Sequence, residues 1–137
     1  MTFAIPFFIR PDPDEDDFLQ VIGSSLASWR TPFQSLDIYR VARELARCVH
    51  AAKIRDRELR DQATRASKSC FLCLCEGLPN DGAALRHKYF VEARNSLAET
   101  VGAMDLAAAI GVVRQDDSDA IQELGSRLRR MLTALLR

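Results

Sequence analysis

Apolar residues recur every three or four positions along most of the chain, which is the spacing of one face of an α-helix. In the first such stretch, from about residue 33 to 53, they are Leu36, Ile38, Val41, Ala42, Leu45, Val49 and Ala52. Similar stretches cover residues 56–76 and 83–110, and a fourth follows residues 116–118 and reaches the C-terminus. The pattern therefore predicts four long amphipathic helices.

The same spacing predicts which side chains face the core. In the second helix they are Leu59, Ala63, Ala66, Cys70, Cys73 and Leu74. In the third they are Leu85, Tyr89, Ala93, Ser96, Leu97, Thr100, Met104, Ala107 and Ala108, and in the fourth they are Ile121, Leu124, Leu128, Met131, Leu132 and Leu135.

Residues at the ends of these stretches support the boundaries. Thr31 and Pro32 suit the N-cap and the first position of a helix. Gly77 and Gly111 suit the left-handed position that follows a helix C-terminus. Suitable N-caps for the last helix are Asp116, Asp117 and Ser118.

Four helices with short connections predict an all-α fold, an antiparallel up-down-up-down four-helix bundle over residues 31–137. Residues 1–30 are then an N-terminal extension, which begins as a proline-containing arm without periodicity. From Asp14 onward, the spacing of apolar residues predicts a short amphipathic helix whose acidic start suits the helix dipole.

Charge is unevenly distributed, although the formal net charge of the 137 residues is zero. Five acidic residues and one basic residue stand in the first 22 positions, which leaves 18 basic and 14 acidic side chains in the remainder. No apolar run reaches the roughly 18 residues of a membrane span, and the N-terminus lacks the basic start of a signal peptide. We therefore expect a cytoplasmic protein with reduced cysteines and no membrane contact.

The stretch "SKSCFLCLCEG" holds three of the four cysteines. On a helix, Cys70 and Cys73 lie about 60° apart, whereas Cys75 points about 140° away from Cys70. The three thiols cannot converge on one ion, and the spacing of Cys48, His50 and His87 supplies no second ligand pair. Their apolar neighbours also disfavour a reactive thiolate. We expect no metal, no cofactor and no catalytic residue.

The central part of this stretch, "CFLCLC" (residues 70–75), is apolar on every side of the predicted helix, whereas a bundle helix normally has one solvent-exposed face. Burial on a second side is then required, most simply against another copy of the chain. The candidate interface residues are Phe71, Leu72 and Cys75. The alternative is that the N-terminal segment of the same chain covers this second side of the helix.

Two further segments carry a resemblance to a known family. Leu59, Gln62, Arg65, Ala66, Ser69, Glu76 and Gly77 match its second-helix pattern L-x-x-Q-x-x-R-A-x-x-S-I-x-x-N-I-A-E-G, and Tyr89, Phe90, Ala93, Ser96, Leu97 and Glu99 match its third-helix pattern Y-[FL]-x-x-A-x-G-S-L-x-E. The opening F-x-x-L-x-[VI]-[YW] is present as Phe33, Leu36, Ile38 and Tyr39. Residues 33–113 thus resemble the four helix bundle protein family, first named from reading frames in intervening sequences of bacterial large-subunit ribosomal RNA genes. The chain departs from the family at Phe71, Cys73, Cys75 and Asn95.

The resemblance implies an antiparallel bundle that assembles as a ring, commonly a homopentamer, and it implies no catalytic activity. The architecture is also similar to the accessory bundle proteins of diversity-generating retroelements, which form pentameric barrels and bind nucleic acid together with a reverse transcriptase. That second likeness is one of fold alone.

Polar residues at spacings of three, four and seven could form a network between the second and third helices. The candidates are Gln62, Arg65, Ser69, Glu76, Arg94, Ser96 and Glu99. They could form a polar site, or a structural network in which Arg65 pairs with Glu99, or Arg94 with Glu76. The structural interpretation is favoured because no nucleophile is nearby and buried charges persist only when paired.

A basic excess around residues 40–68 suggests a surface for RNA or DNA. Its candidates are Arg40, Arg43, Arg47, Lys53, Arg55, Arg57, Arg60 and Lys68. Pairs such as Arg40 with Glu44, or Asp61 with Arg65, would neutralise part of it, whereas a ring would repeat what remains. The leading hypothesis is a non-enzymatic homo-oligomeric scaffold or protein-interaction module, and the alternative is a nucleic-acid-binding accessory factor.

Overall fold

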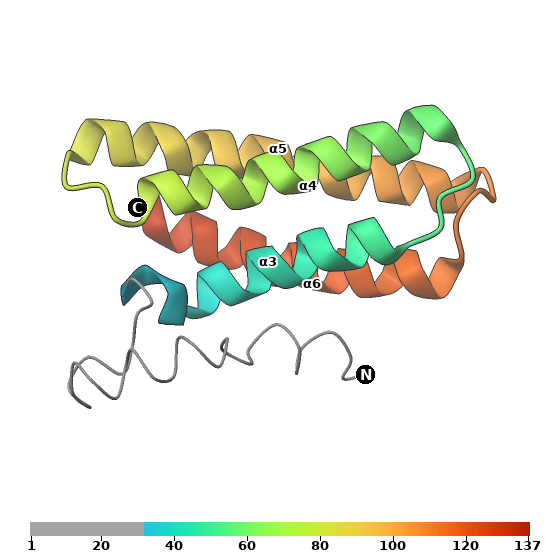
Figure 1. Ribbon diagram of the computed structural model, residues 1–137, viewed down its shortest axis with the longest axis horizontal. Helices are drawn as coiled ribbons and strands as arrows, with labels where there is room; N and C mark the ends of the chain where they lie inside the picture. Colours follow the sequence, from blue (N-terminus) through green and yellow to red (C-terminus); the bar gives the residue numbers. More distant parts are fainter. Residues whose placement is uncertain (1–31) are drawn as a thin grey trace, which may run out of the picture. The chain divides into compact units, whose positions relative to one another are not determined.

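The computed structural model describes residues 32–137, and these residues contain helices and no strand. In chain order the elements are the 3₁₀ turn η2 (Pro32–Ser35) and the α-helices α3 (Asp37–Ala51), α4 (Arg57–Gly77), α5 (Ala83–Ala109) and α6 (Gln115–Leu135). Successive helices run in opposite directions (Figure 1), so the predicted all-α, up-down-up-down bundle is confirmed. The arm and short helix predicted before residue 31 lie outside the described residues.

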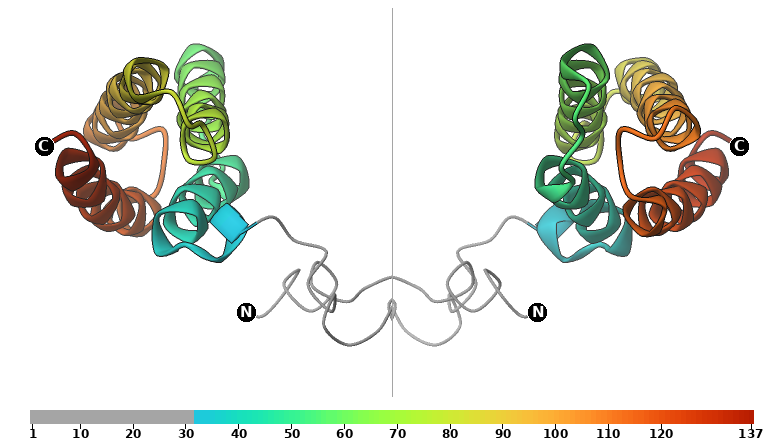
Figure 2. Two further views of the ribbon diagram at one scale, coloured as in Figure 1. Left: turned by 90° about the vertical axis from the view of Figure 1, so that its left-hand side faces the viewer. Right: turned by 90° about the vertical axis from the view of Figure 1, so that its right-hand side faces the viewer.

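The four helices surround a common core, as the views along the bundle show (Figure 2). Each helix packs on its neighbours in sequence, and α3 closes the bundle against α6. The most extensive contact joins α4 and α5. Small buried side chains allow these two helices to approach closely: Ala63, Ala66, Ser67 and Cys70 on α4, and Ala93, Thr100 and Ala107 on α5.

Most predicted core positions are buried, and the largest fully buried side chains include Leu45, Leu74, Leu97, Met104, Ile121, Leu128 and Leu132. Three predictions are wrong, because Leu36, Leu85 and Leu135 are exposed. Leu85 lies in the first turn of α5 and Leu135 is the last residue of α6, so both stand at one end of the bundle, where neighbouring helices end.

The start of the first long helix also differs from the prediction. Residues 32–35 form the separate turn η2, and α3 begins at Asp37 after Leu36, which makes no side-chain capping hydrogen bond. In contrast, Asp56 caps α4, because its carboxylate accepts a hydrogen bond from the Leu59 amide at 2.9 Å.

Gly77 does not occupy the left-handed position that we expected, since it is the last residue of α4 itself. Its lack of a side chain serves packing instead: a Cβ there would lie 2.8 Å from Cε1 of Phe90 and 3.0 Å from Cβ of Tyr89. Gly77 therefore lets the end of α4 rest directly on α5.

Gly111 does end α5 as predicted, with φ of 77°. The Val112 amide donates to the Ala107 carbonyl at 2.9 Å and the Gly111 amide donates to the Ala108 carbonyl at 3.1 Å, which is the pair of bonds of a Schellman motif.

The predicted N-caps of the last helix are wrong, because the N-cap is Arg114. Asp116 and Asp117 lie in the first turn of α6, where their negative charge interacts favourably with the positive end of the helix dipole. Ser118 is buried. The Ser118 hydroxyl donates to the Met104 carbonyl of α5 at 3.2 Å.

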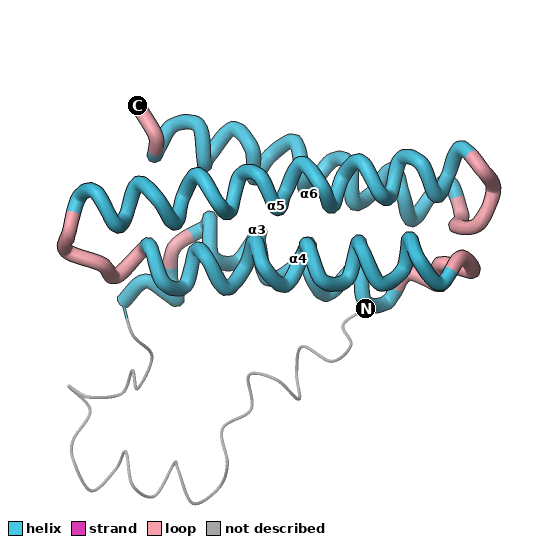
Figure 3. The backbone as a smooth tube through the Cα atoms, turned by 90° about the horizontal axis from the view of Figure 1, so that it is seen from above, coloured by secondary structure: helices cyan, strands magenta, loops and turns pink. Residues whose placement is uncertain are grey.

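At the end of the bundle that holds the α3–α4 and α5–α6 connections (Figure 3), Arg55 joins the two. Its amide donates to the Val112 carbonyl at 2.8 Å, and its guanidinium donates to the Gly111 carbonyl. Arg55, a nucleic-acid candidate, thus has a structural partner.

Candidate functional site

The cysteines of α4 point in different directions, as the helical spacing predicts. Cys70 is buried in the core, and burial raises the pKa of its thiol to about 12. Cys73 and Cys75 are half-buried, and burial is also the main cause that raises their thiol pKa values. These thiols stay protonated at neutral pH and fill space. Within residues 32–137, no group of histidine, cysteine and acidic side chains is arranged to hold a metal ion.

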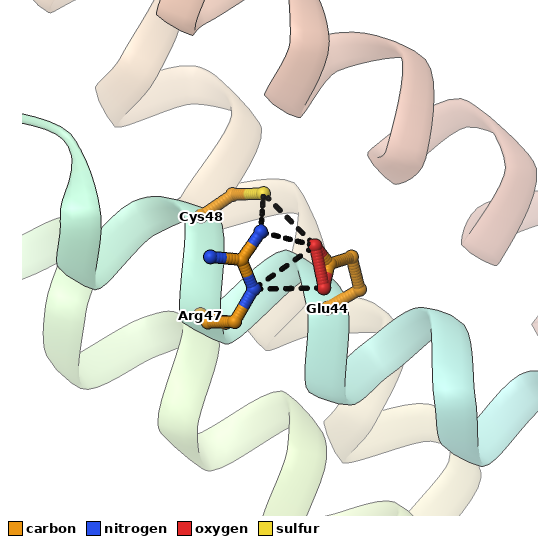
Figure 4. Close-up of polar contacts among 3 residues, drawn as sticks. All are labelled: Glu44, Arg47 and Cys48. Atoms are coloured by element: carbon orange, nitrogen blue, oxygen red, sulfur yellow. Dashed lines mark hydrogen bonds and ion pairs between the residues drawn. The ribbon is translucent and has the colours of Figure 1, made fainter. Parts of the chain in front are cut away.

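Cys48 of α3 stands beside a bidentate ion pair between Glu44 and Arg47 (Figure 4). Its sulfur lies 3.6 Å from Oε1 of Glu44 and 3.8 Å from Nη2 of Arg47. Burial, followed by the Glu44 charge, raises the pKa of the Cys48 thiol, while Arg47 opposes that effect. The hydrogen bond from Arg47 lowers the pKa of Glu44. Glu44, Arg47 and Cys48 thus place a thiol that stays protonated beside an ion pair, all on α3.

The three interface candidates do not share one surface. Phe71 is half-buried, and its ring packs on Tyr39 of α3 with the ring centroids 5.2 Å apart. Cys75, one turn further along, is also half-buried against the core. Leu72 is the exception, since 56% of its surface is exposed. The chain itself therefore covers most of one side of the apolar stretch and leaves Leu72 open.

The predicted polar network exists only in part. Ser69 of α4 and Ser96 of α5 share a hydrogen bond of 3.0 Å between their hydroxyls. Arg65 donates to Gln62 at 3.0 Å along α4. The Glu76 carboxylate is the main cause that raises the pKa of Tyr89.

The two ion pairs expected in this network are wrong, since neither Arg65–Glu99 nor Arg94–Glu76 is among the ion pairs of residues 32–137. Arg65 turns along its own helix toward Gln62 instead of across to α5. Arg94 and Ser96 are two residues apart, about 200° around a helix, so they cannot face the same neighbour. Ser96 meets α4, and Arg94 lies on the side of α5 that faces α6.

The basic candidates of α3 are mostly engaged within the protein. Arg40 pairs with Asp37, Arg47 pairs with Glu44, and Arg43 lies over the Tyr39 ring at 5.8 Å. The Arg40–Glu44 pair that we expected is replaced by these neighbours, and Asp61 does not pair with Arg65. Lys53, Arg57, Arg60 and Lys68 are exposed.

The outer face of α4 carries a shallow groove of about 750 Å³, to which His50 of α3 also contributes. Lys68, Leu72 and Glu76 follow one another at intervals of four residues along it, so they lie on one stripe of the helix. Arg60, Asp61, Thr64 and Arg65 line it toward the start of α4, and Ser69 and Cys73 line its edge. We call this surface the α4 face.

A second groove, of about 370 Å³, lies between α5 and α6 and was missed from the sequence. Arg94 and Asn95 of α5 and Gln122, Ser126 and Arg129 of α6 supply its polar lining. The signal in the sequence was the spacing of four and three between the α6 residues, which puts them on one stripe. We call it the α5–α6 groove.

The comparisons agree with this architecture. The sequence profile of the 23S rRNA-intervening sequence protein family matches residues 34–134. A crystal structure from Bacteroides thetaiotaomicron VPI-5482, described as a protein of unknown function from the S23 ribosomal protein family, is similar with a TM-score of 0.67. It is 15% identical, and the alignment covers 73% of this chain and 98% of that chain, so it supports the fold. No curated protein matches. Since the profile spans most of the described bundle, the chain belongs to the 23S rRNA-intervening sequence protein family.

Proposed function

We propose that this protein is a non-enzymatic helical bundle that associates with copies of itself through the α4 face and acts as a scaffold or protein-interaction module. The observation that carries the proposal is Leu72, a large apolar side chain of α4 that is 56% exposed although it lies more than one turn before the end of the helix. Covering an exposed leucine with a partner surface removes apolar area from water and so favours association.

The charges beside Leu72 support a second copy as that partner. Lys68 lies four residues before Leu72 and Glu76 four residues after it, and all three are exposed on the α4 face. If two α4 helices cross antiparallel at Leu72, Lys68 of each copy comes opposite Glu76 of the other. The stripe is therefore complementary to itself, as a two-fold symmetric contact requires.

A ring of five, which the family resemblance implies, would instead place the α4 face against a different surface of the next subunit. The mass in solution separates the two arrangements. Light scattering should give about two or about five times 15.4 kDa. A monomer at micromolar concentration would overturn the proposal.

Variants locate the contact. Leu72→Glu should reduce the mass to that of a monomer, whereas Leu106→Glu should not, because Leu106 is 50% exposed on α5 away from the α4 face. For the two-fold contact, Lys68→Glu or Glu76→Lys alone should weaken association, since each places like charges opposite one another. The double variant should restore association; if it does not, the antiparallel pairing is wrong.

Nucleic-acid binding is the second candidate. The observation in its favour is that Arg57, Arg60 and Lys68 are exposed on α4 without an ion pair among residues 32–137. Phosphate contacts of this kind give an affinity that falls as salt rises. Filter binding of RNA and DNA between about 50 and 200 mM salt tests it, and no binding at the lowest salt would contradict it.

A further inference from the structure

The α5–α6 groove exists because of one missing side chain. Gly125 lies in the interior of α6, and a Cβ there would come within 2.5 Å of Cγ1 of Val101 on α5. The glycine thus keeps the two helices close, and Val101 and Leu97 form an apolar floor beneath the polar lining.

The groove carries positive charge and no acidic residue in its lining. Arg94 comes from the α5 side and Arg129 from the α6 side. None of the nearest acidic side chains along these helices lines the groove. Glu92 contacts Cys73 of α4, and Glu123 lines a different hollow together with Glu44 of α3. Glu99 is exposed four residues after Asn95, and Asp119 accepts a hydrogen bond from Gln115 at 2.9 Å. Cations from two helices are therefore left to attract an anion.

Neither arginine has a partner in the described part of the chain. No ion pair or hydrogen bond of residues 32–137 involves Arg94 or Arg129, and Arg94 is half-buried. By contrast, Arg130 donates to the Ser126 hydroxyl at 3.0 Å, which leaves that hydroxyl proton available to a ligand. A partly desolvated guanidinium without a counter-charge gains most from a ligand that supplies one.

One polar group of the lining is already held in place. Gln122 donates through Nε2 to the Val101 carbonyl at 2.9 Å, which ties the two helices together across the groove. Asn95 adds an amide that can donate. Since the lining contains no aromatic side chain, a nucleobase has nothing to stack on, and recognition falls to the charged group of the ligand.

We propose that the α5–α6 groove binds a phosphate group, with the guanidinium groups of Arg94 and Arg129 as its two main contacts. Two planar forks suit phosphate, whose several oxygens accept paired hydrogen bonds from more than one arginine. The phosphate could belong to a nucleic-acid backbone or to a small phosphorylated compound. The inference does not depend on self-association through α4.

The test uses the full chain in phosphate-free buffer at low salt. Calorimetry measures binding of pyrophosphate, and filter binding measures a 20-nucleotide single-stranded RNA, with polyglutamate as a carboxylate competitor. Arg94→Gln and Arg129→Gln should each weaken binding about tenfold, as expected when a charge-assisted contact is lost. Arg114→Gln, which removes an exposed charge at the other end of α6, should leave binding unchanged.

The outcomes separate the sources. RNA binding that depends on both arginines supports a nucleic-acid backbone, and pyrophosphate binding without RNA binding supports a small phosphorylated compound. The proposal is overturned if neither ligand binds, if both variants bind like the wild type, or if polyglutamate competes as well as phosphate does. RNA binding lost in Arg57→Gln and kept in Arg94→Gln would place the nucleic acid on α4 and also overturn it. Thermal melting and light scattering of each variant confirm that fold and mass are unchanged.

Discussion

Replacement of Gly125 by alanine tests whether α5 and α6 pack as closely as the structure shows. Two effects oppose one another. Alanine is favoured over glycine in a helix interior by about 0.8–1.0 kcal/mol. The new Cβ, however, would lie 2.5 Å from Cγ1 of Val101 and 3.7 Å from Cδ1 of Leu97.

Val101 cannot move away easily. It is β-branched and lies within α5, where one side-chain rotamer is strongly preferred. Relief of the contact then needs a poor rotamer or a shift of the helices, and such overpacking costs about 1–3 kcal/mol. Packing exceeds helix propensity over most of this range, so we expect Gly125→Ala to lower the free energy of unfolding by up to about 2 kcal/mol.

Gly102→Ala is the matched control. Gly102 is exposed in the interior of α5, and a Cβ there meets nothing within 4 Å. Only the propensity term remains, so this variant should be more stable than the wild type by about 0.8–1.0 kcal/mol. Urea unfolding at one fixed protein concentration measures both, because association makes stability depend on concentration. If Gly125→Ala is as stabilising as Gly102→Ala, the close contact between Gly125 and Val101 is wrong.

Three further predictions concern a cap, a buried hydrogen bond and a buried thiol. Asp56→Ala should lose about 1 kcal/mol of unfolding free energy because the Leu59 amide loses its acceptor, and Asp56→Asn should retain most of it; equal losses in urea melts would contradict the cap. Ser118→Ala should lose about 1 kcal/mol because it removes the hydrogen bond to the Met104 carbonyl, and an unchanged urea midpoint would show that this bond contributes nothing. Burial raises the pKa of Cys70 to about 12, whereas the unfolded thiol ionises near its usual pKa of about 8.5. The folded state then holds a proton that the unfolded state releases, so stability should fall as the pH rises above about 8.5, and Cys70→Ala should make that fall shallower; identical slopes would contradict the burial effect.

Helical spacing was sufficient to locate the bundle, because apolar periodicity reports directly which face is buried. It correctly separated Cys70, which is in the core, from Cys75, which is not. The same spacing should have separated Arg94 from Ser96, which lie on opposite sides of α5.

Other features depend on neighbours far along the chain, which no local pattern contains. Gly77 looks like a helix-ending residue in sequence, yet Phe90 of α5 is the reason that only glycine fits. Phe71 looks available for another subunit, yet Tyr39 covers part of its ring. The α5–α6 groove depends on Gly125 meeting Val101, 24 positions apart in the sequence.

The bonds of Arg55 have a consequence for where the chain tolerates engineering. Because this residue holds the carbonyls of Gly111 and Val112, the two connections at that end form one unit, and inserted residues in either would disrupt both. At the opposite end, the turn between α4 and α5 has mainly local hydrogen bonds, such as Asn80 to Gly77 and Gly82 to Asn80. A peptide tag, a protease site or new chain termini therefore belong next to Asp81, which is exposed.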